Sequence, residues 1–92
     1  CNVENAAYPA GSCAEQGASS AMVLGGDTKI ADIYVMGDGE HPTSPCGSCR
    51  QRIREFATPE TRVHICDRNG VRITKNLTEI LPISFGPENL EL

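Results

Sequence analysis

Three cysteines in two short motifs constrain the fold of this chain more than any other feature of its sequence. Cys46 and Cys49 form a Cys-x-x-Cys pair, and Cys13 opens the segment Cys13-Ala14-Glu15. If a helix begins at the pair, its two sulfurs share one helix face, and this spacing suits a single tetrahedral metal ion. Three thiolates would leave the fourth position of a zinc ion open for water, as in a catalytic zinc site.

The same residues allow other interpretations. A structural zinc ion needs four protein ligands, for which His41 is the candidate fourth, and a Cys-x-x-Cys pair can also be redox-active. Glu15 completes a helix capping box if Ser12 is the N-cap. Beside an open zinc position, however, the Glu15 carboxylate could transfer protons as a general base and acid.

The cysteine count favours metal binding over disulfides. The chain has five cysteines, so a disulfide framework would leave one unpaired. Thiolate metal ligands are typical of a reducing compartment, which predicts a cytoplasmic protein. We expect the two cysteines outside the motifs, Cys1 and Cys66, to be ordinary buried residues.

The length and net charge of the chain limit the number of domains and the kinds of partner that it can have. A chain of 92 residues forms one domain at most. Its net charge of −4 gives little long-range attraction for phosphate backbones, which argues against a nucleic-acid partner. No apolar run approaches the ~20 residues of a membrane-spanning helix.

Hydrophobic periodicity and turn residues predict alternating helices and strands, hence a layered α/β domain. Residues 30–36 form a β-branched run that we expect to be a strand buried on both faces. Asn69-Gly70 predicts a hairpin turn. The remaining expected elements are helices over 13–24, 46–57 and 77–81 and strands over 63–66 and 71–74.

Four blocks of the sequence together resemble the cytidine deaminase family. They are Asn2-Val3-Glu4-Asn5-Ala6, Cys13-Ala14-Glu15, Pro45-Cys46-Gly47-Ser48-Cys49-Arg50-Gln51 and Leu81-Pro82-Ile83-Ser84-Phe85-Gly86-Pro87. The resemblance covers nearly the whole chain. It implies a three-layer α/β/α fold with a mixed sheet. It also implies zinc-dependent hydrolytic deamination of cytidine and deoxycytidine to uridine and deoxyuridine, a reaction of pyrimidine salvage.

The resemblance also implies a role for each site residue. The zinc ligands and the general acid/base would be Cys13, Cys46, Cys49 and Glu15. The groups that contact substrate would be Asn2, Glu4, Ala14, Ser44 and Phe85. Asn2 and Glu4 alternate along an expected extended segment, so both side chains should point the same way. The resemblance implies that this pair holds the ribose hydroxyl, although a solvated strand end would show the same alternation. The Ala14 N–H and the Ser44 carbonyl would read the pyrimidine edge, and Phe85 would reach a neighbouring subunit of a homotetramer.

Two departures from the family pattern stand out. Gln16 occupies the position where three-cysteine members usually carry an Arg that tempers the thiolate charge. The family domain begins with a helix and two strands, and this chain starts where the second strand ends, so we expect residues 1–92 to be an N-terminally incomplete domain. Two functions other than cytidine deamination stay open. The chain could be a related deaminase of a nucleotide, free base or aminonucleoside, or a non-catalytic zinc-binding remnant. The net charge disfavours a nucleic-acid deaminase.

Overall fold

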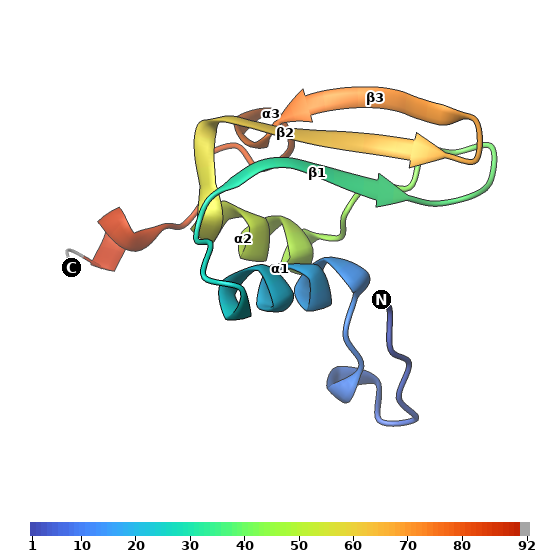
Figure 1. Cartoon of the computed structure of the whole chain (residues 1–92), viewed down its shortest axis with the longest axis horizontal. Helices are drawn as coiled ribbons and strands as arrows, with labels where there is room; N and C mark the ends of the chain where they lie inside the picture. Colours follow the sequence, from blue (N-terminus) through green and yellow to red (C-terminus); the bar gives the residue numbers. More distant parts are fainter. Residues whose placement is uncertain (91–92) are drawn as a thin grey trace.

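Strands and helices alternate along the chain and assemble into a mixed sheet flanked by helices (Figure 1). The structure, a computed structural model, describes residues 1–90. Its elements are η1 (Tyr8–Ala10), α1 (Ala14–Leu24), β1 (Ile30–Met36), α2 (Gly47–Phe56), β2 (Ala57–Asp67), β3 (Gly70–Asn76), α3 (Leu77–Ile80) and η2 (Pro87–Leu90). The predicted α/β class with a mixed sheet is confirmed. Within this described part, no helix has the length and apolarity needed to cross a membrane.

The sheet has the order β1-β2-β3. β1 and β2 are parallel, so the chain must cross over between them, and α2 lies on this crossover. β2 and β3 are antiparallel and form the hairpin that Asn69-Gly70 predicts. Gly70 has φ 123°, a conformation that glycine adopts without the strain a side chain would introduce.

The hydrophobic core lies between the sheet and the helices. Ile53 of α2 is fully buried and packs with Ile30 of β1 and Leu77 of α3. Figure 1 shows α1 and α2 on the same side of the sheet. Ser19 is the one buried residue of α1, and Met22 of that helix is partly buried against the core. The core therefore depends mainly on α2, while α1 contributes chiefly Met22.

The prediction that residues 30–36 are buried on both faces is wrong. Ile30 and Val35 are buried, but the side chains of Tyr34 and Met36 are 66% and 68% exposed. Successive strand residues point to opposite faces, and α1 and α2 cover only one of them. On the other face, Tyr34 stacks on the His64 ring with centroids 4.4 Å apart.

Three smaller expectations also need correction. Cys13, rather than Ser12, is the N-cap of α1, and it makes no side-chain capping bond. Ser12 is instead paired through its backbone with Val3. Cys1 is exposed, whereas Cys66 is buried as expected. β2 begins at Ala57, within the stretch predicted to end the helix, because the backbone there pairs with Ile30.

Candidate metal centre and active site

Three cysteine sulfurs meet where two helices begin. Cys13 is the N-cap of α1, Cys46 is the N-cap of α2, and Cys49 lies in the first turn of α2. The three Sγ atoms lie within 4.8 Å of one another. Within residues 1–90 this is the one group of three or more His, Cys, Asp or Glu side chains arranged to hold a metal ion, and His41 is not part of it. The prediction that the two motifs come together as a cluster able to hold a metal ion is confirmed.

The surroundings of the sulfurs differ in ways that matter for metal binding. The backbone N–H of Cys49 donates toward the Cys46 sulfur and lowers the pKa of the Cys46 thiol, and the Cys49 side chain acts in the same direction. Burial raises the pKa of the Cys49 thiol, and its hydrogen bonds with Cys46 and Cys13 raise it further. A divalent cation among the sulfurs opposes this increase because it favours thiolates outright.

The donor set fits zinc. Soft thiolates select Zn²⁺ over Mg²⁺ or Ca²⁺, and three protein ligands leave one position for a reacting molecule. Three thiolates give the site an excess negative charge. The N-termini of α1 and α2 carry partial positive charge and free N–H groups, so both helices stabilise that charge. The resemblance to a zinc enzyme and the chemistry of the site therefore agree.

Glu15 lies beside the sulfurs in the first turn of α1. Its carboxylate is one of the groups that raise the pKa of the Cys49 thiol, after the effects of burial and hydrogen bonding. Glu15 and Ala14 line a hollow of about 200 Å³ between α1 and the β1 residues Ile33–Met36. The carboxylate is thus close to the metal-binding cluster and borders a space open to a small molecule.

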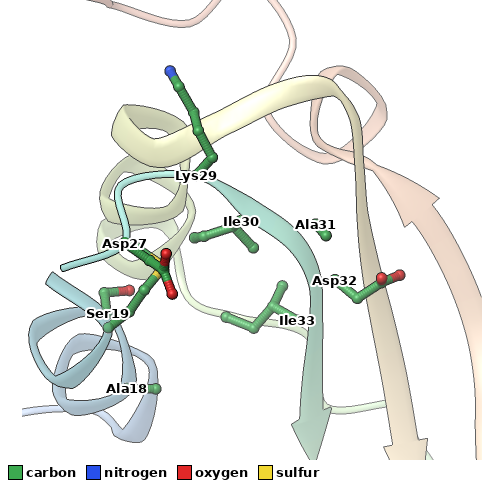
Figure 2. Close-up of a pocket in the computed structure, with 9 residues that line it drawn as sticks. Ala18, Ser19, Asp27, Lys29, Ile30, Ala31, Asp32 and Ile33 are labelled. Carbon is green, nitrogen blue, oxygen red and sulfur yellow. The ribbon is translucent and has the colours of Figure 1, made fainter. Parts of the chain in front are cut away.

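A larger hollow lies farther along α1. It has a volume of about 410 Å³, and none of the three cysteines lines it. Figure 2 shows that Ile30 and Ile33 point into it, whereas Lys29 points away and Asp32 points across β1 toward β2. There, Asp32 accepts a hydrogen bond from His64 at 2.8 Å, so its carboxylate is already partnered. The larger hollow is mainly apolar and offers few groups for a nucleoside.

The N-terminal segment returns to the metal site. Val3 and Ser12 exchange two backbone hydrogen bonds of 2.8 and 2.9 Å, which brings this segment next to the residue before Cys13. Asn2 and Glu4 flank Val3, and the Asn2 amide donates to the Glu4 carboxylate at 3.1 Å. The expectation that these two side chains point the same way is confirmed. Both are exposed and available to a ligand.

The other two expected substrate contacts are Ser44 and Phe85. Ser44 is exposed and precedes the buried Pro45 at the entry to α2. Phe85 lies in the C-terminal tail, where its carbonyl accepts a hydrogen bond from Gln51 and its side chain is 57% exposed. The tail leaves the domain near the junction of α2 and β2 (Figure 1). Phe85 is not among the residues that line the hollow beside Glu15.

Sequence reasoning missed Arg50, whose side chain organises the entry to α2. Its guanidinium donates to Pro45, Ser44 and Ile80. The available signal was an arginine directly after the Cys-x-x-Cys pair, one helical turn beyond the N-cap and therefore able to fold back on the loop before it.

Comparison with known proteins agrees with this geometry. The family model of the cytidine and deoxycytidylate deaminase zinc-binding region matches residues 1–65, which include all three cysteines and Glu15. The chain belongs to this deaminase family. Among curated members, it is 37% identical over 90 residues to a cytidine deaminase of Sporosarcina psychrophila and 41% identical over 86 residues to one of Mycoplasma pneumoniae.

Solved structures of the deaminase family have the same fold. The crystal structure of cytidine deaminase from Burkholderia pseudomallei superimposes with a TM-score of 0.83 at 34% identity, covering 92% of this chain and 68% of that one. The aligned regions cover 98% and 91% of this chain but only 66% and 65% of the Sporosarcina and Mycoplasma proteins. The chain thus spans slightly less than two thirds of the length of these curated relatives.

Proposed function

We propose that this protein hydrolyses cytidine and deoxycytidine to uridine and deoxyuridine with release of ammonia. The observation that carries the proposal is the cluster of Cys13, Cys46 and Cys49 with Glu15 one turn into α1. Three thiolates with one vacant position are typical of a catalytic zinc, and the hollow beside Glu15 gives a small molecule access. The similarity to cytidine deaminases supports the same substrate class.

The proposed roles of the residues follow from their positions. Cys13, Cys46 and Cys49 would hold Zn²⁺, which would supply Lewis acidity that lowers the pKa of the attacking water. The Glu15 carboxylate would transfer two protons in turn: the first from the water to the ring nitrogen N3, and the second from the added hydroxyl group to the amine, which leaves as ammonia. The N–H of Ala14, at the N-terminus of α1, has no acceptor within the helix and can donate to the pyrimidine edge.

The proposed substrate contacts predict that the protein selects a nucleoside over its 5′-phosphate. The Ser44 carbonyl accepts a hydrogen bond from the base, and Asn2 and Glu4 bind the ribose hydroxyl. The Glu4 carboxylate is suited to a hydroxyl donor, and its negative charge would repel a 5′-phosphate. In this proposal, the protein is a cytoplasmic enzyme of pyrimidine salvage.

A direct assay tests this function. Loss of cytidine absorbance in the ultraviolet, with metal analysis of the same sample, should show turnover by protein that contains one zinc per chain. Zinc at this stoichiometry without turnover would instead identify a non-catalytic zinc-binding domain. Turnover limited to a nucleotide or a free base would point to a related deaminase.

The sugar contacts lead to a prediction about selectivity. We expect kcat/KM for cytidine to exceed the values for cytosine and for cytidine 5′-phosphate by at least about 100-fold, because a site that binds a hydroxyl penalises a ligand that leaves its polar groups unpaired. Glu4→Ala should reduce this ratio, while Glu60→Ala, at an exposed position on β2, should preserve it. Similar efficiency on cytosine and cytidine in the parent would contradict the assignment.

We also propose a homotetramer in which Phe85 of one subunit borders the site of another. The support is that α2 holds the tail while the Phe85 ring stays exposed. Arg54 donates to Ser84 and pairs with Glu88, and the absence of a side chain at Gly86 leaves room for the Arg54 guanidinium. The tail is thus anchored with its aromatic side chain facing outward.

Light scattering combined with the deaminase assay tests the proposed assembly. Phe85→Ala should raise KM and weaken oligomerisation without removing zinc, because Phe85 lies outside the sulfur cluster. Leu24→Ala, which truncates a still more exposed apolar side chain on α1, should alter neither property. A monodisperse monomer of residues 1–92 that turns over cytidine at an ordinary enzymatic rate would refute the tetramer.

A further inference from the structure

One guanidinium joins two distant segments at the entry to α2. Arg50 Nε donates to the Pro45 carbonyl at 2.8 Å, and Nη2 donates to Ser44 Oγ at 2.9 Å. Nη1 donates to the Ile80 carbonyl at the end of α3, at 2.6 Å. The three donors of Arg50 thus fix the loop immediately before Cys46 to the C-terminal end of α3.

The contacts of Arg50 differ from those of most other arginines in the domain. Arg54, Arg68 and Arg72 each pair with a carboxylate. In the described part of the chain, Arg50 forms no ion pair, and each of its acceptors is a neutral oxygen. The positive charge of Arg50 is therefore not neutralised by a carboxylate, and Arg50 directly follows Cys49, one of the proposed zinc ligands.

The position of Arg50 couples the loop to the metal ligands. Its backbone N–H donates to the Cys46 carbonyl at 2.9 Å, so Arg50 bonds the carbonyls of both Pro45 and Cys46, through its side chain and its main chain respectively. Pro45 is fully buried, which limits the alternatives open to its carbonyl. A shift of this loop would move the Cys46 ligand and the Ser44 carbonyl together.

From this geometry we infer that Arg50 is a positioning residue that holds the Cys46 ligand and the Ser44 carbonyl in register. The metal part of this inference stands on the sulfur cluster alone, and its substrate part rests on the proposed function. Lysine cannot replace Arg50, because an ammonium lacks the planar fork that reaches three acceptors at once. Groups that orient metal ligands typically contribute about 10- to 100-fold to metal affinity.

The first test measures zinc release to a chromogenic chelator, which needs no enzymatic activity. Arg50→Lys should release zinc about 10-fold faster than the parent. Arg52→Lys is the matched control, because Arg52 lies on the same helix and donates only to Ser48 within α2. A parental release rate in folded Arg50→Lys would overturn the inference. If that variant does not fold, Ser44→Ala removes one acceptor and should also speed release, and an unchanged rate would count against the inference.

The second test separates positioning from a general loss of stability. Free guanidinium at low millimolar concentration should slow zinc release from Arg50→Ala and leave release from Arg52→Ala unchanged. Because the guanidinium ion can refill only a preformed set of acceptors, absence of this rescue would contradict positioning by Arg50.

The third test uses cytidine kinetics. Arg50→Lys should raise KM by a larger factor than it lowers kcat, because the Ser44 carbonyl moves while Glu15 on α1 does not. Equal effects on the two constants would remove the substrate part of the inference. The parent could bind zinc without deaminating cytidine, while Arg50→Lys still releases zinc faster than the parent. In that case the proposed function fails and the metal part of the inference survives.

Discussion

Glu15→Gln should leave zinc bound and abolish nearly all turnover. The amide keeps the shape of the side chain but cannot exchange a proton, and general acid–base catalysis typically contributes about 10²–10⁴ in rate. Glu15 is not one of the three ligands, so zinc content should remain at the parental level. The measurement is kcat for cytidine together with metal analysis of the same preparation.

The appropriate control is Glu55→Gln, which makes the same chemical change at an exposed position near the end of α2. It should retain parental kcat. An activity of Glu15→Gln within tenfold of the parent would show that the carboxylate is not the proton-transfer group. The structure already removes the capping-box explanation, because Cys13 is the N-cap and makes no side-chain capping bond.

The second large effect is expected for Cys46→Ala. The substitution removes one of three thiolate ligands and leaves two, so we expect near-complete loss of the metal and of activity. Cys46 is the informative choice because it is exposed, so the smaller side chain leaves no cavity, whereas Cys49 is fully buried. Metal analysis after purification should find less than a tenth of the parental zinc.

Cys1→Ala provides the comparison for this result. Cys1 is also an exposed thiol, but it is not part of the sulfur cluster. Its replacement should preserve one zinc per chain. If Cys46→Ala also retained full zinc stoichiometry, Cys46 would not be a ligand and the donor set would need to be reassigned.

The parts of the site that local sequence encodes were predictable. The spacing of Cys46 and Cys49 places both sulfurs at the start of a helix, one at the N-cap and one in the first turn, and Asn69-Gly70 specifies its turn without help from the rest of the chain. The juxtaposition of Cys13 with this pair was inferred from the chemistry of metal ligands.

The features that failed prediction depend on contacts between distant segments. Ser12 has the properties of an N-cap, but its backbone is paired with Val3, and the helix begins one residue later. The exposure of Tyr34 depends on which face of the sheet the helices cover, and the strand sequence does not encode that choice. Arg50 contacts Ile80, thirty residues away, which no local pattern reveals.

The weak packing of α1 has a consequence for the order in which this domain loses structure. Ser19 is the one buried residue of that helix and Met22 is only partly buried against the core, so few apolar contacts oppose the detachment of α1. An ion shared by Cys13 and the α2 cysteines would close a long loop of the chain, as a disulfide does, and so reduce the entropy gained when α1 separates. Chelation should therefore increase amide hydrogen exchange in α1 well before it does so in β2, with α1 behaving as a separate unfolding unit.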